Sequence, residues 1–435
     1  MSHISIQEAM KLGSGTVHVR GWVHRERGSN KMKFVILRDS SNTIQCILKK
    51  DAFEDRWDEI DSLQVESSIE IDGEIKEDPR APTGYEIQVT NFTIVGKSDT
   101  YPITKDQSIE FLADNRHLWL RSRKMQAILK IRSCVLGAIH DFFREKGYYE
   151  FHAPIFQPNA CEGGSTLFEV KYFDSIMYLA QSWQLYAESA VFSLEKIYNV
   201  SPTFRSEKSK TSRHLAEFWM AEMEGAWMHL EDVTEIAKAE IKFIIQKVLE
   251  KHTVELELLG RDIEKLKICS EKEYPTITYT EALKLLNEKC DMKVEWGKDL
   301  RTIEEEKLME LFDTPIIVID YPKEVMAFYK PERSPTPENV PGPVAKCFDM
   351  LAPEGFGEIV GGSERETDAK RLVEELKKEG EDPATYDWYI DLRKYGSVPH
   401  SGYGLGVERV VKWICGLESI KDVIPFPRTM ERFTP

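Results

Sequence analysis

The chain is organised around Phe204-Arg205-Ser206-Glu207, which continues as Lys208-Ser-Lys-Thr-Ser-Arg213-His214-Leu215 and Glu217-Phe218-Trp219-Met220. Two β-prone segments flank a basic, Ser/Thr-rich loop, a pattern that predicts an antiparallel hairpin with a long tip. The tip carries the cationic side chains of Arg205, Lys208, Lys210 and Arg213. Because the arginine fork matches phosphates and carboxylates, the tip is a candidate polyphosphate site; the alternative is a solvated basic turn.

A second segment strengthens the nucleotide interpretation. It reads Ser401-Gly402-Tyr-Gly404-Leu-Gly406-Val-Glu408-Arg409 and runs into the apolar-periodic residues 410–414. Its glycine spacing is neither that of a dinucleotide fingerprint nor that of a P-loop. Glycine lets the backbone pass close under a flat ligand, and Arg409 at the start of a helix can stack on an aromatic base. The two segments together therefore predict a nucleotide site.

Composition limits the class of protein. With 435 residues, of which 41% are hydrophobic, the chain can bury a large core and is expected to hold about two or three domains. The sequence lacks a long apolar run and a signal-peptide pattern, so we expect a cytoplasmic protein with no membrane partner. Its seven cysteines form no CxxC pair, which suggests neither a zinc site nor a disulfide framework.

Charge is spread unevenly along the chain. The net charge is −16, which argues against indiscriminate binding to polyanions. Residues 1–50 nevertheless carry nine Lys/Arg against three Asp/Glu, whereas residues 51–100 carry four against fourteen. The basic N-terminal part predicts local binding to nucleic acid, and the alternative is accidental surface chemistry.

The N-terminal part predicts a small β-barrel. Apolar and polar residues alternate with a period near two in five segments, at 16–24, 32–38, 43–48, 67–76 and 85–95. Five such strands, with a helix expected at 51–60, indicate a barrel of the oligonucleotide-binding (OB) type. Trp22 and Phe34 are candidates for base stacking, with core packing as the alternative.

The rest of the chain predicts an α+β domain. We expect an OB-fold domain at 1–98, a hinge or linker at 99–123 and a catalytic domain at 124–435. A long helical pattern stops at Gly147 and is followed by a β-prone run ending at Pro154. Helices are grouped around strands without strict βαβ alternation, which favours an antiparallel sheet flanked by helices.

Two carboxylates are candidate metal ligands. Asp349 and Glu358 lie on a strand-loop-strand pattern, and Mg²⁺ prefers such oxygen ligands when it shares its shell with phosphate. Without this context each is more simply a surface acid. No nucleophilic side chain is evident, which suits chemistry that depends mostly on positioning and electrostatics.

These segments together resemble the class II aminoacyl-tRNA synthetases. The long helix, the strand and the closing Pro154 are similar to the first signature motif. The hairpin is similar to the second motif, and the glycine segment is similar to the third. The resemblance to the aspartyl/asparaginyl subgroup covers essentially the whole chain and also includes Glu162-Gly-Gly, Gln181-Ser-Trp-Gln184-Leu-Tyr186, residues 358–365, Tyr395-Gly-Ser-Val-Pro-His400 and Pro425-Phe-Pro-Arg428.

The resemblance implies a set of nucleotide contacts. Arg205 would bridge the amino-acid carboxylate and the α-phosphate, and Arg409 would sandwich adenine with Phe218; these two arginines are the implied catalytic residues. Arg213 and His214 would hold the terminal phosphates. The implied ATP-binding residues are Arg205, Glu207, Arg213, His214, Leu215, Phe218, Glu358, Gly406, Val407, Glu408 and Arg409.

The resemblance also implies an amino-acid pocket and a metal site. Glu358 would bind Mg²⁺ with help from Asp349, and Arg365 would reach the side-chain oxygen of the amino acid. The implied amino-acid-binding residues are Glu162, Gln184, Tyr186, Glu188, Arg205, Gly361 and Arg365.

Two departures from the aspartyl pattern favour asparagine as the substrate. Aspartyl enzymes have a lysine after Gln-Leu-Tyr/Phe, where this chain has Ala187 and Glu188. They also have a serine where this chain has Gly361, which puts the second metal ligand in doubt. We predict that Glu188 accepts from the amide nitrogen while Arg365 donates to the amide oxygen, with a purely supporting role for Glu188 as the alternative.

The implied activity is ATP-dependent formation of asparaginyl-adenylate from L-asparagine, followed by transfer to the 3′ end of tRNA(Asn). A homodimer through residues 124–156 is also implied. Three alternatives stay open: an aspartyl enzyme, which would need another cation in place of the missing lysine; an ammonia-dependent asparagine synthetase; and a non-enzymatic RNA-binding protein.

Overall fold

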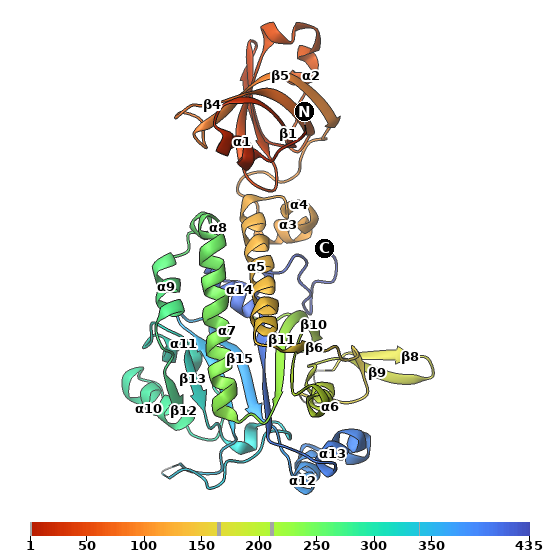
Figure 1. Cartoon of the computed structure of the whole chain (residues 1–435), viewed down its shortest axis with the longest axis vertical. Helices are drawn as coiled ribbons and strands as arrows, with labels where there is room; N and C mark the ends of the chain where they lie inside the picture. The colour runs from red at the N-terminus through yellow and green to blue at the C-terminus, as the bar shows by residue number, and fades with distance from the viewer. Residues whose placement is uncertain (1, 163–166, 209–212, 339) are drawn as a thin grey trace. The chain divides into compact units, whose positions relative to one another are not determined.

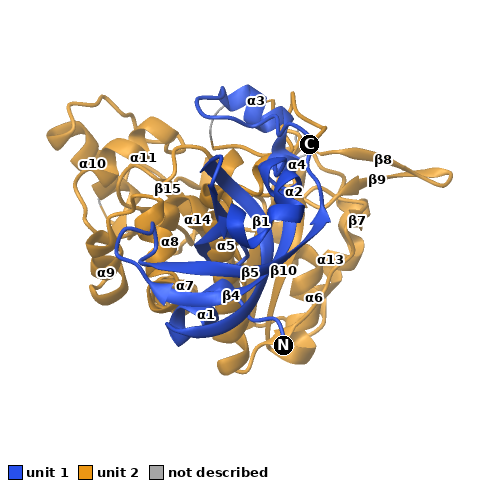
Figure 2. Cartoon of the chain, turned by 90° about the horizontal axis from the view of Figure 1, so that it is seen from above, with its two compact units in different colours: residues 1–118 blue, residues 119–435 orange. Residues whose placement is uncertain are grey.

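The computed structural model describes residues 2–162, 167–208, 213–338 and 340–435. The chain forms two compact units, residues 1–118 and 119–435, which are described separately (Figure 2). Lys210 and the two glycines after Glu162 lie outside the described residues. The boundaries expected at 98 and 123 stay predictions.

The first unit is a closed five-stranded barrel (Figure 1). Strand order in the barrel is β1-β2-β3-β5-β4, and the predicted OB-type barrel is confirmed. Its strands are β1 (Gly15–Ser29), β2 (Met32–Arg38), β3 (Thr43–Lys49), β4 (Ser68–Glu77) and β5 (Tyr85–Gly96). Alternate residues point inward because successive strand side chains face opposite sides, so Val17, Val19 and Val23 are buried.

Short helices accompany the barrel. α1 (Ile6–Leu12) begins at a capping box formed by Ser5 and Glu8, a helix that we did not predict. α2 (Trp57–Asp61) overlaps only the end of the stretch 51–60 that was expected to be helical, and α3 (Ile109–Asp114) and α4 (Arg116–Trp119) occupy part of the expected hinge. Among the described residues, 3₁₀ helices span Lys50–Ala52, Glu54–Arg56, Lys323–Val325, Pro383–Tyr386 and Ile420–Asp422.

The two aromatic candidates of the barrel are not core residues. Trp22 is 45% exposed. Phe34 is half-buried, and the guanidinium carbon of Arg27 lies 5.3 Å from the centre of its ring. Both side chains are therefore open to stacking.

The second unit is built on an eight-stranded sheet in the order β12-β13-β14-β15-β16-β11-β10-β6. Neighbours are antiparallel except at the two edges, where β12 pairs with β13 and β6 with β10 in parallel. The predicted antiparallel sheet is thus confirmed in its centre. The strands are β6 (Tyr149–Glu150), β10 (Lys196–Phe204), β11 (Glu217–Ala226), β12 (Thr276–Thr278), β13 (Ile316–Ile319), β14 (Cys347–Ala352), β15 (Gly357–Glu364) and β16 (His400–Gly406).

Three helices supply most of the apolar face packed against this sheet. α5 (Arg123–Glu145), α7 (Leu230–Lys251) and α14 (Val407–Cys415) contribute to one continuous core with residues of β11, β15 and β16. α5 and α7 lie side by side along the sheet (Figure 1). Of the described helices, none combines the length and apolar character needed to cross a membrane.

Smaller elements complete the unit. β7 (Phe156–Gln157), β9 (Ser175–Leu179) and β8 (Glu169–Tyr172) form a separate three-stranded sheet. The remaining helices are α6 (Gln184–Leu194), α8 (Thr253–Leu258), α9 (Ile263–Glu271), α10 (Tyr279–Lys289), α11 (Thr302–Met309), α12 (Ala369–Glu379) and α13 (Asp387–Lys394). All seven cysteines are free.

The strand register brings the distant sequence segments together. β10 and β11 form the predicted hairpin, with Phe204 opposite Glu217. β11 then pairs with β16, which carries the glycine segment, and β16 pairs with β15. Gly404 faces Glu222 on one side and Gly361 on the other, so the hairpin, the glycine segment and the strand of Glu358 share one surface.

Candidate active site

Two adjacent cavities lie over β11, β15 and β16, with volumes of about 630 and 670 Å³. Arg205, Met220, Glu358 and Gly404 line both of them. The first cavity is otherwise lined by Glu207, Arg213, His214, Leu215, Phe218, Ile359, Gly406, Glu408, Arg409 and Ile420. Because Arg205 lines both cavities, one guanidinium can contact a ligand in each.

Cations and one aromatic ring line the first cavity. The guanidinium carbon of Arg205 lies 5.7 Å from the centre of the Phe218 ring. Nη1 of Arg409 donates to Oε2 of Glu358 at 2.8 Å. Half-buried arginines beside a ring suit a flat base and its phosphates.

Glu408 ties this cavity to the hairpin. Its Oε2 accepts from the backbone N–H of Trp219 at 2.9 Å, and its Oε1 pairs with Arg132 of α5 at 2.7 Å. The side chain is 2% exposed. We therefore assign it a supporting role as well as a place in the lining.

Asp349 and Glu358 converge beside Gly361. A Cβ atom at Gly361 would lie 3.1 Å from Oε1 of Glu358 and 3.3 Å from Oδ1 of Asp349. Burial and the charge of Glu358 raise the pKa of Asp349 well above its usual value. Burial acts in the same direction on Glu358, but Arg409, Arg205 and Arg213 outweigh it and lower that pKa. Two carboxylates that approach the same point beside Gly361 fit a shared divalent cation.

The second cavity contains a buried ion pair, formed by Arg365 and Glu224. Nε and Nη2 of Arg365 donate to the two oxygens of Glu224 at 2.9 and 2.8 Å, while Nη1 donates to Ser363 at 2.8 Å. Burial raises the pKa of Glu224, and the charge of Arg365 opposes this increase. A bidentate pair of this kind presents a fixed acceptor next to fixed donors.

Other polar groups complete the second cavity. Glu162 accepts from the hydroxyl of Tyr329 at 2.7 Å, and its backbone N–H donates to Gln181 at 3.1 Å. Glu222 accepts from the backbone N–H of Trp183, and burial raises its pKa to about 7. The cavity can thus hold a small ligand that carries both positive and negative groups.

The comparisons with known proteins agree with this geometry. Residues 108–430 match the family described as tRNA synthetases class II (D, K and N), and residues 17–95 match the OB-fold nucleic acid binding domain. The chain is a class II tRNA synthetase.

Known relatives match the synthetase over almost its whole length. It is 47% identical over 420 residues to the asparagine–tRNA ligase of Thermoplasma acidophilum, with 96% of each chain covered. It superposes with a TM-score of 0.95 on asparaginyl-tRNA synthetase from Pyrococcus horikoshii complexed with asparaginyl-adenylate, at 41% identity and full coverage of both chains. A putative aspartyl-tRNA synthetase from Leishmania major is similar at 26% identity and a TM-score of 0.87, covering 100% of this chain and 95% of that one.

These matches confirm three predictions: the class II family, the aminoacyl-tRNA ligase activity and the asparaginyl subgroup. The predicted ATP-binding residues of the synthetase also meet around one cavity, with one exception. The side chain of Val407 is buried in the core beneath the sheet and does not line the cavity. The other ten line the cavity.

The role predicted for Glu188 in the synthetase is corrected by the structure. Its side chain is fully buried and lies outside the lining of the second cavity. It accepts from Tyr389 at 2.6 Å, from Gln184 at 3.0 Å, from His400 at 3.0 Å and from Arg393. Burial opposes ionisation, but Arg393, His400 and Arg365 outweigh it and lower the pKa of Glu188. A carboxylate with so many donors is not available to a substrate amide.

Tyr186 is also misplaced by the sequence prediction. Its ring packs against Trp388, with ring centres 4.8 Å apart, and it does not line the cavity. The other residues predicted to bind the amino acid all line this cavity: Glu162, Gln184, Arg205, Gly361 and Arg365. On α6 only Gln184 therefore lines the second cavity, while Tyr186 packs against Trp388 of α13.

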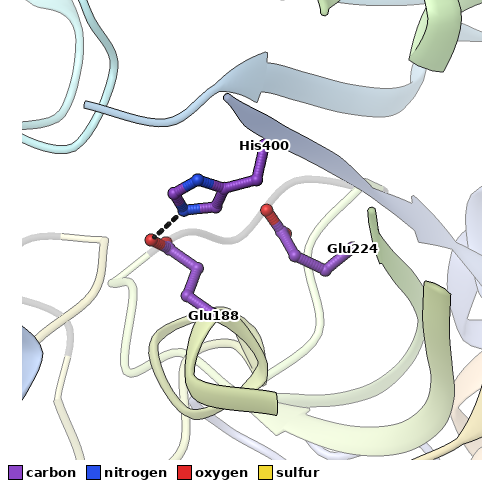
Figure 3. Close-up of side chains that lie close together, drawn as sticks. All are labelled: Glu188, Glu224 and His400. Carbon is purple, nitrogen blue, oxygen red and sulfur yellow. Dashed lines mark hydrogen bonds and ion pairs between the residues drawn. The ribbon is translucent and has the colours of Figure 1, made fainter. Parts of the chain in front are cut away.

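Glu188, Glu224 and His400 come close enough to ligate a metal ion (Figure 3). Their carboxylates, however, already face the guanidinium groups of Arg393 and Arg365. A divalent cation placed there would lie beside two buried positive charges. We therefore interpret the trio as part of an ion-pair network.

Sequence reasoning missed Glu224, Tyr329 and Lys330, which line the second cavity. A usable signal for Glu224 existed: Glu222 and Glu224 alternate with apolar residues in one strand, so both acids face the same side of a buried sheet. Lys330 belongs to a loop without periodicity. Burial lowers its pKa, but Cys347, Glu162 and Asp349 together raise it, so the amine stays charged.

Proposed function

We propose that this synthetase activates L-asparagine with ATP and transfers it to tRNA(Asn). The observation that carries the substrate assignment is the pair of Glu224 and Arg365 in the second cavity. Glu224 accepts from the amide nitrogen of asparagine and Arg365 donates to the amide oxygen. Aspartate would instead place a second carboxylate against Glu224, and burying like charges is costly.

Activation takes place where the two cavities meet. Arg205 holds the amino-acid carboxylate and the α-phosphate of ATP, so the carboxylate oxygen can attack phosphorus in line with the departing pyrophosphate. Glu162 accepts from the α-ammonium group. Arg213 and His214 hold the terminal phosphates, and adenine lies between Phe218 and Arg409.

Asp349 and Glu358 would hold Mg²⁺. Their oxygens converge, and oxygen donors are the ligands that this ion prefers. When bound, the ion neutralises phosphate charge. Gly361 supplies no hydroxyl there, so Asp349 and Glu358 would be the side chains that hold the ion.

The aspartyl alternative required another cation, and Lys330 lies in the cavity. Glu224 opposes that alternative because its acceptor oxygens flank Arg365. Pyrophosphate exchange measured in parallel with asparagine and with aspartate distinguishes an asparaginyl enzyme from an aspartyl enzyme. We expect kcat/KM to favour asparagine by at least about a hundredfold; comparable exchange with both would support a non-discriminating enzyme.

The barrel, residues 1 to about 98, binds the anticodon stem-loop in this proposal. Trp22 and Phe34 lie on its outer side with Arg27. Replacing both aromatic residues by alanine in the full chain should raise the KM for tRNA roughly tenfold, because stacking on each base contributes about 1–3 kcal/mol. Pyrophosphate exchange, which needs no tRNA, should stay at the parent level. Equal loss of both activities would contradict this division.

An ammonia-dependent asparagine synthetase, the other alternative, has no need of an RNA-binding surface on the barrel.

A cytoplasmic homodimer through residues 124–156 is also part of the proposal. Tyr149, Ile155 and Phe156 are 59, 42 and 44% exposed, and exposed apolar side chains grouped in this way are typical of interaction surfaces. Light scattering at micromolar concentration should give twice the chain's 50.3 kDa mass.

A further inference from the structure

Glu305 of α11 reaches the phosphate end of the first cavity from a segment that none of the synthetase motifs includes. Its Oε2 accepts from Nη2 of Arg213 at 2.9 Å. The same oxygen accepts from the backbone N–H of Glu358 at 3.2 Å. One carboxylate oxygen thus contacts both an arginine assigned to the phosphates and the backbone of a metal ligand.

The surrounding structure fixes this arrangement. The side chains of Arg213 and Glu305 are only 11% and 12% exposed. Nη2 of Arg213 also donates to the carbonyl oxygen of Phe356 at 3.1 Å. A Cβ atom at Gly357 would lie 2.1 Å from Nη2 of Arg213 and 2.4 Å from Oε2 of Glu305, and its φ of +69° is the left-handed region that favours glycine. Glycine at 357 is therefore needed to admit the pair.

We propose that Glu305 is a positioning residue for adenylation. It orients the Arg213 guanidinium toward the terminal phosphates of ATP and holds the backbone of Glu358. This inference rests on the proposed function, and it extends the nucleotide site to α11.

The carboxylate has two opposing effects on ATP. It reduces the net positive charge that the phosphates meet, and it fixes the direction of the arginine fork. Charge reduction acts only on the attraction between the phosphates and this part of the cavity. Loss of orientation affects Arg213 and Glu358 together, and misplaced catalytic groups reduce rates strongly. We therefore expect the positioning effect to exceed the charge effect.

The test compares Glu305→Gln with Glu306→Gln in the full-length protein. The first variant keeps side-chain size but removes the charge that Arg213 pairs with; the second removes a neighbouring charge on the same helix. We expect Glu305→Gln to lower kcat/KM for ATP in pyrophosphate exchange about tenfold, and Glu306→Gln to change it less than about twofold. Calorimetry should show weaker binding of ATP and pyrophosphate to Glu305→Gln, with AMP binding unchanged, because AMP lacks the terminal phosphates.

Combination with Arg213→Ala gives the decisive result. If Glu305 acts through Arg213, the double variant should be no worse than Arg213→Ala alone. Additive losses, equal weakening of ATP and AMP, or a Glu305→Gln variant that matches the parent would each overturn the inference. Absence of asparagine-dependent exchange in the parent would instead refute the proposed function, while the comparison of ATP with AMP binding would still judge Glu305.

Discussion

The two cavities of the synthetase manage charge in different ways. In the first, the ion pair of Arg409 and Glu358 is about one-third exposed, with side-chain exposures of 30 and 33%. In the second, Arg365 and Glu224 are 4 and 1% exposed, and behind them Glu188 and Arg393 are fully buried. The Arg409–Glu358 pair, which we assign to the nucleotide, thus stays partly hydrated, whereas the charges that we propose to distinguish an amide from a carboxylate are already dehydrated.

Physical chemistry explains the contrast. Phosphates carry enough charge to attract arginines through water, and exposed arginines can rearrange around them. Asparagine and aspartate differ by one charge and a hydrogen-bond donor, and water at the site would weaken that difference. Removing individual side chains should therefore have different consequences in the two cavities.

The largest loss should follow a change where the cavities meet. Arg205→Lys keeps the charge but loses the planar fork, so it cannot contact a carboxylate and a phosphate together. We expect kcat/KM for both ATP and asparagine to fall about a thousandfold in pyrophosphate exchange, or about 4 kcal/mol. A loss confined to one of the two substrates would show that the cavities do not share Arg205.

A change behind the second cavity should affect stability. Glu188→Gln leaves Arg393 buried without its full charge partner, and we expect the free energy of unfolding to fall by about 3 kcal/mol in urea at neutral pH. Folding lowers the pKa of Glu188 below the ordinary glutamate value of 4.5. Its contribution is therefore fully present above that ordinary value and is lost as the pH falls through the lowered pKa of the folded state. The parent and the variant should converge in acid; a difference that persists there would mean that packing, not charge, is responsible.

The same two cavities show how far the sequence could be read. The hairpin, the glycine segment and Glu358, which line the first cavity, were predictable because local patterns of arginine, glycine and acid are typical of sites for a charged ligand. Glu188 was misassigned because its place in the sequence, beside Gln184, suggested that it lines the amino-acid pocket. Four hydrogen-bond donors from α6, α13 and β16 instead hold its carboxylate outside that pocket. Only the pairing of β11 with β16 and the packing of α13 decide that Glu224 of β11, and not Glu188 of α6, lines the second cavity.

A smaller effect should appear in the choice of substrate. Glu224→Gln removes the charge that repels aspartate, and the ratio of kcat/KM for asparagine to that for aspartate should fall about fiftyfold. Glu222→Gln is the matched control, because Glu222 lies on the same strand and lines the same cavity but contacts Trp183 and Ser182. Equal changes in the two variants would assign discrimination to the net charge of the cavity.

The smallest effect should come from Gly361, where the two cavities adjoin the carboxylates of Asp349 and Glu358. Its φ is not in the left-handed region, so a side chain is tolerated there. The new Cβ would lie 3.1 and 3.3 Å from the two carboxylates, so they must move by a few tenths of an ångström. Gly361→Ala should therefore bind Mn²⁺, used as a spectroscopic substitute for Mg²⁺, slightly more weakly than the parent. Gly361→Ser adds a hydroxyl oxygen near the proposed ion, which should offset this movement and tighten Mn²⁺ binding about threefold relative to Gly361→Ala. Identical Mn²⁺ affinities in the two variants would show that the hydroxyl does not reach the ion, and the cation would then have to lie farther from β15 than the carboxylate geometry suggests.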